Sequence, residues 1–471
     1  MIRAELKPTL RLAVPVILAE LGWMSMGLVD TIMVGPLGPA AIGAVGVGNS
    51  LHLGFAIFGM GLLLGLDTLV SQAYGARDLA LGRRWLATGI RLALIATLPL
   101  VAVLLAVYAA IPVLGFNAET GELLGGYYLV VIGSTPFLLL YAAFRRYLQS
   151  THHVAPVMFA LVSANVVNAL ANWALIHGNL GLPALGVPGA AWATFASRVY
   201  MSGLLAGAVW WADRTALHTT GHLSSGEGSP ARQGGPALQA GGTTPPRAGQ
   251  ALGRTSIRRL VELGLPAAST VTAEVGVFAL ATALAGRLEP VATASHQIAL
   301  NIAAVAFMIP LGLASAGAVR VGNAVGAQSP RGAAAAGWTV IAMSVAFMLF
   351  SGLLFVLIPR TLIGFFTRDA EVLALGSSLL LIAAVFQLFD GLQGVITGTL
   401  RGLGDTRTPM VTNLGAHWLV GLPVGYSLCF IAGWGAAGLW WGLSVGLILA
   451  GGILLTVWAR SVRHYQRTGR I

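Results

Sequence analysis

The sequence is poor in charged residues and has almost no cysteine. Charged residues make up 9% of its 471 positions, against 56% hydrophobic residues, which leaves too little polar surface to cover a soluble domain of this length. The single cysteine, Cys429, excludes disulfide bonds and thiolate metal clusters within the chain. No cleavable signal peptide is expected, because the first apolar segment contains Glu20 and Asp30 and has no small-residue cleavage site. The composition therefore predicts a membrane protein.

Long apolar stretches recur along almost the whole sequence, and each is long enough to cross a bilayer as a helix of about 20 residues. Segments such as 92–114 and 340–358 are apolar on all sides, whereas the strands of a membrane β-barrel are shorter and alternate in polarity. The pattern therefore predicts an all-α, polytopic fold. Twelve transmembrane helices are expected, with approximate spans 10–34, 41–72, 87–114, 125–148, 155–177, 187–211, 260–285, 292–320, 335–358, 371–399, 409–431 and 436–459.

The formal net charge of +11 follows the expected topology. Basic residues gather at the termini and in the loops after even-numbered helices: Arg3, Lys7, Arg77, Arg83, Arg84, Arg145, Arg146, Arg331, Arg401, Arg407, Arg460, Arg463, Arg467 and Arg470. The opposite loops contain little beyond Arg287, Arg360 and Arg368. By the positive-inside rule both termini are cytoplasmic, in a multi-pass protein of the cell inner membrane. Because topology and anionic lipid account for the charge, no nucleic-acid partner is expected.

Residues 213–257 differ in composition from the segments on either side. Gly, Pro, Ser, Thr, Ala and Arg dominate this stretch, which includes the run GTTPPRAGQ, and such a segment cannot bury enough apolar surface to fold. We expect a flexible cytoplasmic linker here. It separates an N-lobe (residues 1–212, the first six helices) from a C-lobe (residues 258–471, the last six).

The two lobes repeat one another in sequence. An offset of 251 residues aligns, without a gap, Pro15 with Pro266, Gly61 with Gly312, and Gly75-Ala76 with Gly326-Ala327. Because six helices are an even number, both copies have the same orientation, which predicts two bundles related by a pseudo-two-fold axis along the membrane normal. Such a pair leaves a central cleft that each side of the membrane can reach in turn.

Acidic residues inside membrane helices are costly and commonly mark ion or substrate pathways. Five lie within the expected helices: Glu20, Asp30, Asp67, Glu274 and Asp390. Glu274 and Asp390 belong to helices of the same lobe, about two to three turns from the nearest loop. Two carboxylates that meet there would share a proton or hold Na⁺ with neighbouring oxygens. The alternative is that each is neutral and serves packing through hydrogen bonds.

The other three acids have weaker support as coupling residues. Asp30 lies near the outer end of the first helix, where it either braces the next loop or takes part in coupling. Glu20 and Asp67 are expected to be structural and to pair with Arg198 or Arg91 in neighbouring helices.

Polar side chains in other helices allow two interpretations. Asn165, Asn168 and Asn172 share one helix face, where amides either line a cavity or join helices through hydrogen bonds. Three histidines show no spacing typical of metal ligands and are expected to be structural: His52, His296 and His417.

Taken together, these segments resemble the multidrug and toxic compound extrusion (MATE) family, NorM-like branch, over almost the whole chain. The resemblance rests on PVILAELGWMSMGLVDTIMVGPLG, LVSQAYGA, NVVNALANWALIHGNLGLPALGVPGAAWAT, the helices of Glu274 and Asp390, and LRGLGDTRTP. It implies a V-shaped pair of six-helix bundles and antiport of cationic or amphipathic compounds against Na⁺ or H⁺. Glu274 and Asp390 match the family's C-lobe cation site, and Asp30 matches the first-helix acid assigned to proton coupling or cation relay.

Two positions depart from the family pattern. The proton-coupled DinF-like branch is expected to have an aspartate where this chain has Asn172, leaving only Asn168 of that pair. An amide does not titrate, so the resemblance favours Na⁺ over H⁺ as the coupling ion. The second departure is Phe386, where related proteins are expected to have a tyrosine one turn before Asp390.

The expected function is a cation-coupled multidrug antiporter without cofactor or enzymatic activity, a monomer whose partners are small-molecule drugs, cations and membrane lipid. One alternative is a flippase of lipid-linked precursors from the same wider superfamily. It needs a basic cleft for pyrophosphate, but only Arg91 and Arg198 are expected inside helices. The other alternative, an intramembrane enzyme, lacks a paired-Asp metal motif, an HExxH motif or a positioned nucleophile.

Overall fold

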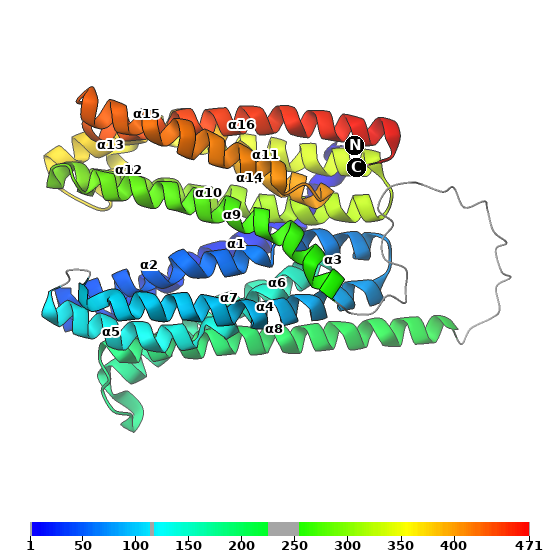
Figure 1. Ribbon diagram of the computed structural model, residues 1–471, viewed down its shortest axis with the longest axis horizontal. Coiled ribbons are helices and arrows are strands. Elements are labelled where there is room, and N and C mark those ends of the chain that lie inside the picture. The colour runs from blue at the N-terminus through cyan, green and yellow to red at the C-terminus, as the bar shows by residue number, and fades with distance from the viewer. Residues whose placement is uncertain (1, 114–116, 225–253, 471) are drawn as a thin grey trace.

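The structure is a computed structural model that describes residues 2–113, 117–224 and 254–470, and in this part of the chain all regular elements are helices (Figure 1). Ten of them are long and apolar enough to cross a membrane, and a bent pair of helices makes an eleventh span. The helix α8 (Val187–Ser224) runs beside them and completes twelve. The expected all-α fold of twelve spans in two bundles is confirmed.

The N-lobe contains α8 and seven helices that precede it: α1 (Ile2–Val34), α2 (Pro39–Leu62), α3 (Gly65–Gly75), α4 (Leu79–Ala110), α5 (Ala118–Gly133), α6 (Thr135–Ser150) and α7 (Val154–His177). The C-lobe contains α9 (Arg254–Ala285), α10 (Pro290–Gly326), α11 (Pro330–Leu357), the short α12 (Pro359–Gly364), α13 (Ala370–Leu403), α14 (Arg407–Asn413), α15 (Leu422–Tyr426) and α16 (Gly435–Thr468). The segments 414–421 and 427–431, between and after α14 and α15, are π-helical.

One expected span, 125–148, is divided in the structure into α5 and α6, which meet at an angle of 45°. The cause is local. Pro136 has no N–H to donate to the preceding turn, so the helix cannot continue its hydrogen-bond ladder there. The hydroxyls of Ser134 and Thr135 instead donate to the carbonyls of Val131 and Ile132, at 2.6 and 2.7 Å. The bend therefore leaves these two carbonyls satisfied inside the membrane.

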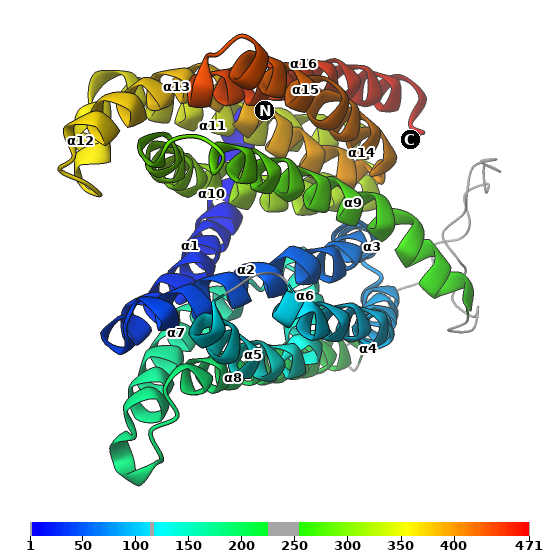
Figure 2. The same cartoon turned by 60° about the vertical axis from the view of Figure 1, so that its left-hand side comes forward.

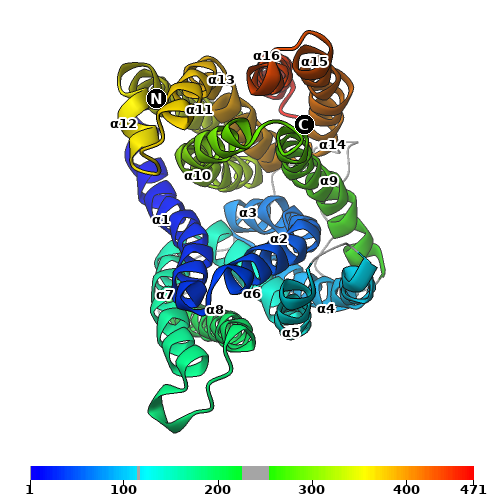
Figure 3. The ribbon, with the colours of Figure 1, turned by 90° about the vertical axis from the view of Figure 1, so that its left-hand side faces the viewer.

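The first helix of each lobe begins in the hydrophobic core of the other lobe. Leu12 and Val16 of α1 belong to a hydrophobic core otherwise made mainly of C-lobe helices, and Leu260 of α9 belongs to the core of the N-lobe. Figure 2 shows α1 crossing from one bundle to the other. Each of these helices contains one proline of the sequence repeat, Pro15 or Pro266. Figure 3, seen from the side opposite the termini, shows the two bundles with α1 and α9 at their junctions.

Equivalent contacts between the lobes are made by residues that are 251 positions apart, the offset of the sequence repeat. A Cβ atom added at Gly61 would lie 2.5 Å from the Cα of Ala268, and one added at Gly312 would lie 3.0 Å from the backbone nitrogen of Ile17. Ile17 and Ala268 are themselves separated by 251 positions, like the two glycines. Both contacts are too close for any side chain but hydrogen. The structure thus reproduces the repeat as a pseudo-two-fold relation in space.

The two termini lie at one end of the molecule, which we call the terminal side (Figure 1). Residues 225–253, the greater part of the predicted linker 213–257, lie outside the described residues. Both ends of the predicted linker are helical in the structure: α8 extends to Ser224, and α9 begins at Arg254. The exact division of the chain into lobes and linker therefore stays a prediction.

The lobes touch on the terminal side and diverge away from it (Figure 1). Glu5 and Arg320 form an ion pair across this contact, and His152 hydrogen-bonds Asn323. Partial burial, with the positive charge of Arg320, lowers the pKa of His152 to about 4. The imidazole is therefore neutral near pH 7 and does not repel Arg320.

Candidate functional site: the cavity between the lobes

A cavity of about 610 Å³ lies between the two lobes, and residues of both lobes line it. This volume is in the range of sites for drug-sized ligands. Most of its wall is apolar, with Trp23 and Met60 from the N-lobe facing Phe278, Phe307 and other C-lobe side chains. Methionine and aromatic side chains adapt to ligands of different shape. The cavity therefore suits varied amphipathic molecules.

Glu274 and Asp390, predicted from sequence as a pair, both line this cavity. Glu274 comes from the middle of α9 and is half-buried, whereas Asp390 comes from α13 and is buried. Gln393, three positions after Asp390 on α13, lies close to Glu274. Gln393 in turn lies 3.2 Å from His417, in the π-helical segment 414–421. The structure thus brings two carboxyl groups to the lining of one cavity, and carboxylate oxygens are the kind of ligand that hard cations take.

Phe386 also lines the cavity, one helical turn before Asp390. Its ring packs against Trp440, with centroids 5.8 Å apart, and the indole N–H of Trp440 donates to His296 at 3.0 Å. His296 also contacts Thr282 at 3.0 Å, so this histidine is hydrogen-bonded as expected. With no hydroxyl at position 386, the residue contributes an apolar surface beside the two acids.

The end of the cavity toward the terminal side, which we call the floor, carries charged side chains that sequence reasoning placed elsewhere. Arg145 and Arg146 lie in α6 and Arg401 in α13, and all three line the cavity. The expectation that they belong to loops is wrong, because Arg145 and Arg146 lie within the expected span 125–148 itself and α13 continues past residue 399, where its span was expected to end. The expectation that only Arg91 and Arg198 are helical arginines is wrong for the same reason.

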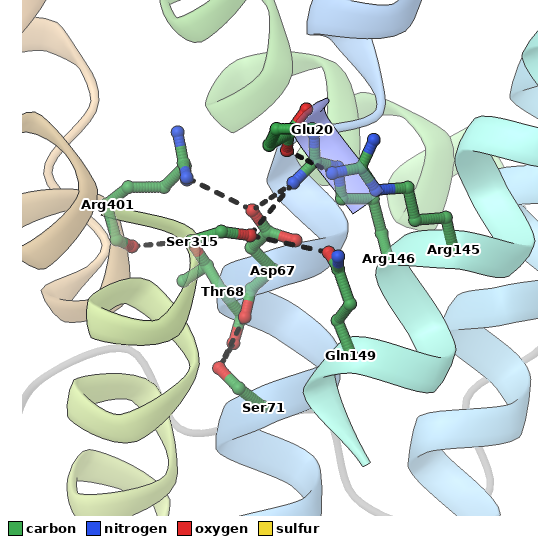
Figure 4. A network of polar contacts seen from close by, with 9 residues as sticks. All are labelled: Glu20, Asp67, Thr68, Ser71, Arg145, Arg146, Gln149, Ser315 and Arg401. Atoms are coloured by element: carbon green, nitrogen blue, oxygen red, sulfur yellow. Dashed lines mark hydrogen bonds and ion pairs between the residues drawn. The ribbon is translucent and has the colours of Figure 1, made fainter. Parts of the chain in front are cut away.

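The partners predicted for Glu20 and Asp67 are also wrong. Glu20 forms an ion pair with Arg145. Oδ2 of Asp67 lies 3.4 Å from Arg146 and 3.2 Å from Arg401, so two guanidinium groups share one carboxylate (Figure 4). These pairings are between helices distant in sequence, and no local spacing could have indicated them.

The network around Asp67 joins the two lobes (Figure 4). Asp67 lies in α3 of the N-lobe and is fully buried, whereas Arg401 lies in α13 of the C-lobe. The neighbouring hydroxyl of Thr68 donates to the backbone carbonyl of Arg401. Ser315, from α10, contacts both Arg146 and Gln149 of the N-lobe at 3.3 Å. Buried polar contacts therefore hold the lobes together on the terminal side.

A second polar cluster lies inside the N-lobe. Asp30 accepts hydrogen bonds from Asn172 at 2.7 Å and from Thr194 at 2.9 Å, and Asn172 also donates to Asn168 at 3.1 Å. Asp30 is buried, and neither amide is exposed to solvent. The asparagine face of α7 predicted from the spacing therefore contacts Asp30. The side chain of Asp30 bonds to neighbouring helices and does not brace the adjoining loop.

The central cavity does not include this cluster among its lining residues, contrary to the expectation that Asn168 and Asn172 line a substrate cavity. Arg198, predicted as a partner of Glu20 or Asp67, instead donates to Ser134 at 2.7 Å and contacts His52 at 3.4 Å. Arg91 is exposed on α4. The described residues contain no group of three or more His, Cys, Asp or Glu side chains that could hold a metal ion.

Comparison with known proteins connects this geometry to one family. Residues 15–174 and 266–427 each match the model of the family MatE, and the two matches start 251 positions apart, the offset of the internal repeat. The chain is 34% identical to "Probable multidrug resistance protein NorM" of Mesorhizobium japonicum, covering 98% of this chain and 95% of that protein. It is also 34% identical to "Multidrug resistance protein PmpM" of Pseudomonas aeruginosa, covering 99% and 94%.

Solved structures confirm the fold. A structure described as the outward-facing conformation of a multidrug resistance MATE family transporter of the MOP superfamily superposes with a TM-score of 0.81 at 19% identity, covering 98% of this chain and 96% of that one. A crystal structure of MATE in the bent conformation gives a TM-score of 0.83 at 18% identity, with the same coverage. With two matches to the family model and curated relatives aligned over nearly their whole length, this multi-pass membrane protein belongs to the MatE family of transporters.

Proposed function

We propose that the protein is a cation-coupled antiporter that exports cationic and amphipathic compounds from the cytoplasm by alternating access. The observation that carries this proposal is the drug-sized cavity between two pseudo-symmetric lobes, with Glu274 and Asp390 together on its wall. Curated relatives of similar length are named multidrug resistance proteins, which supports the substrate class. The protein acts as a transporter, without enzymatic chemistry or a cofactor, and as a monomer in contact with membrane lipid.

The distribution of basic residues supports an orientation with the terminal side in the cytoplasm of the cell inner membrane. In that orientation, the Asp67 network and the Glu5–Arg320 pair close the cavity toward the cytoplasm. The conformation described here is then the one that exchanges ligands with the outside. Breaking these contacts and forming new ones at the opposite end would open the same cavity inward.

The transport cycle follows from competition between ligands. A cation entering from outside binds Glu274 and Asp390 and weakens the binding of drug in the same cavity. The lobes then close outside and open inside, where a drug from the cytoplasm or inner leaflet displaces the cation. Reciprocity requires each ligand to weaken the other by the same factor, typically about 5- to 150-fold. Cation movement down its gradient thereby drives drug efflux.

Native protein in proteoliposomes tests this cycle. Ethidium efflux should follow an imposed Na⁺ gradient more strongly than an imposed pH gradient, because Asn172 beside Asp30 does not titrate. Ethidium release should also accelerate when Na⁺ is added on the outer side alone. Efflux that follows neither gradient would contradict antiport, and drug affinity that is unchanged by either cation would contradict the competition between ligands.

The substitution Asn172→Asp tests the role of the N-lobe cluster. The new carboxyl group would lie at the 2.7 Å position from which Asn172 now donates to Asp30, and two carboxylates at that distance must share a proton. We expect pH-driven efflux of ethidium to rise severalfold over native. Asn165→Asp is the matched control, because Asn165 lies on the same helix but contacts the carbonyls of Gly22 and Leu161. An equal response in both variants would remove the N-lobe cluster from proton coupling.

The flippase alternative gains some support from the arginines at the floor. Pyrophosphate carries several negative charges and is usually held by more than one free basic group. Here Arg145 is paired with Glu20, and Arg146 and Arg401 share Asp67. Only one unit of positive charge is left uncompensated at the floor. A small amphipathic substrate therefore fits the cavity better than a lipid-linked pyrophosphate.

A further inference from the structure

The cavity is polarised from end to end, and α13 contributes the residues that make it so. Phe386, Asp390, Gly394, Thr397 and Arg401 all line the cavity. Their spacings of four, four, three and four positions place them on one face of this helix. Asp390 and Arg401 are eleven positions apart, which corresponds to about 16 Å along the helix axis. One face of α13 therefore leads from an acidic position to a basic one across the cavity.

The charges at the two ends are not balanced locally. Glu274 and Asp390 line the cavity without an ion pair to any described basic side chain. At the floor, Arg146 and Arg401 both contact the single Oδ2 of Asp67, a residue that is not itself exposed to the cavity. The third cavity arginine, Arg145, is neutralised by Glu20. The floor thus has one uncompensated positive charge, and the wall has two carboxyl groups without a basic partner.

Unused hydrogen-bond donors at the basic end point to a ligand. Among the described residues, the Nε–H of Arg401 and the hydroxyl of Thr397 are buried without a hydrogen-bond partner. They lie one helical turn apart on the cavity face of α13. Buried donors are normally satisfied, and each unsatisfied one costs free energy. A carboxylate reaching the floor could accept from such donors and neutralise the excess charge at the same time.

We propose that the floor around Arg401, Arg146 and Thr397 is an anion subsite that binds the carboxylate of zwitterionic, amphipathic substrates, whose cationic group lies toward Glu274 and Asp390. The inference rests on the proposed function and narrows its substrate class. Arg146 and Arg401 come from different lobes, so a bound carboxylate contacts both bundles. Specificity then depends on two opposite charges separated by an apolar body, as well as on cationic character.

Two dyes that differ only at the carboxyl group test this subsite. Rhodamine B has a delocalised cation and a free carboxylate, and its ethyl ester keeps the cation but lacks the anion. We expect fluorescence anisotropy with purified protein to show that Arg401→Gln weakens rhodamine B binding about tenfold, the usual effect of losing a hydrogen bond to a charged group. Binding of the ester should not weaken, because the ester places no negative charge at the floor.

A charge-matched variant separates anion binding from damage to the lobe contact. Asp67→Asn combined with Arg401→Gln removes the ion pair between the lobes but leaves Arg146 as one uncompensated positive charge, as in the native protein. It should retain the preference for rhodamine B over its ester. Loss of that preference in the double variant, or an equal loss of both dyes in Arg401→Gln, would overturn the anion subsite.

Two further readouts identify other failures. If the native protein binds neither dye, the proposed multidrug function is wrong. If the native protein binds both dyes and Arg401→Gln leaves rhodamine B binding unchanged, only the anion subsite is wrong. Inorganic pyrophosphate serves as a competitor. If pyrophosphate displaces rhodamine B from the native protein at a concentration more than about tenfold lower than acetate does, the floor binds a phosphorylated ligand and the carboxylate assignment is overturned.

Discussion

Replacing Glu274 by Gln, or Asp390 by Asn, should abolish the effect of Na⁺ on drug binding. In the native protein, saturating Na⁺ is expected to reduce ethidium affinity by about 5- to 150-fold, the range of typical coupling free energies. Each substitution keeps the size of the side chain but removes one of the two carboxylates that face the cavity. A monovalent cation then loses most of its electrostatic stabilisation. Ethidium affinity should become nearly independent of Na⁺.

The measurement is ethidium fluorescence in purified protein, titrated with and without NaCl at constant ionic strength. Glu289→Gln is the matched control, because Glu289 lies in the same lobe, is exposed and does not line the cavity. It should leave the Na⁺ effect unchanged. Persistence of the full Na⁺ effect in both cavity variants would move the coupling site away from the C-lobe, and Asp30→Asn would then be the variant to test.

The second large effect is expected at the contact between the lobes on the terminal side. A Cβ atom added at Gly326 would lie 1.9 Å from the backbone carbonyl oxygen of Gln72, and one at Gly75 would lie 2.0 Å from that of Asn323. Backbone cannot yield as a flexible side chain can, so α3 and α10 must move apart. Overpacking of this kind costs about 1–3 kcal/mol. Gly326→Ala should therefore disfavour the conformation that is closed on the terminal side.

Accessibility of the cavity reports that shift. A cysteine introduced at Ala304, which lines the cavity, in a background with Cys429→Ser, can be labelled with a membrane-impermeant maleimide in vesicles of each orientation. Gly326→Ala should raise the labelling rate from the terminal side about tenfold, since about 1.4 kcal/mol corresponds to a factor of ten. Gly82→Ala is the control, because a Cβ there meets no atom within 4 Å. Equal rates in the two variants would show that this contact does not set the conformational equilibrium.

The buried contact between the lobes also includes ion pairs, which Gly326→Ala does not alter. Asp67 is surrounded by Arg146 and Arg401, and removing one member of a buried ion pair commonly leaves an uncompensated charge that is costly. Carboxylate-bearing substrates that neutralise Arg401 would act on the same contact. If the proposed anion subsite holds, substrate recognition and closure on the terminal side share these residues.

Hydropathy and the internal repeat were sufficient to predict the helices and their grouping. Apolar spans need internal hydrogen bonding in lipid, which allows few alternatives to helices, and the offset of 251 positions implied the pseudo-two-fold relation. That Glu274 and Asp390 line one cavity could be expected because both are deep in helices of one lobe. Asn168 and Asn172 were rightly placed on one face of α7, but their partner Asp30 lies on another helix.

The arginines at the floor show where sequence reasoning fails. Arg145 and Arg146 fall in the last turn of the expected span 125–148 and Arg401 two positions after the expected span 371–399, and all three were counted with the cytoplasmic loops because they are charged and close to span ends. The helices continue through them, and their charge is tolerated because Glu20 and Asp67 approach from other helices. Such pairings depend on how helices cross in space. A one-dimensional pattern contains no information on that crossing.

The sequence by itself determined the membrane environment, the twelve helices, the duplicated lobes and the family, because each depends on composition, periodicity or similarity along the chain. Only the tertiary structure decided that Asp30 binds Asn172 inside the N-lobe, that Asp67 joins the lobes through two arginines, and that the cavity is acidic on its wall and basic at its floor. The physical reason is that burial and pairing of charge are properties of three-dimensional contacts between distant segments.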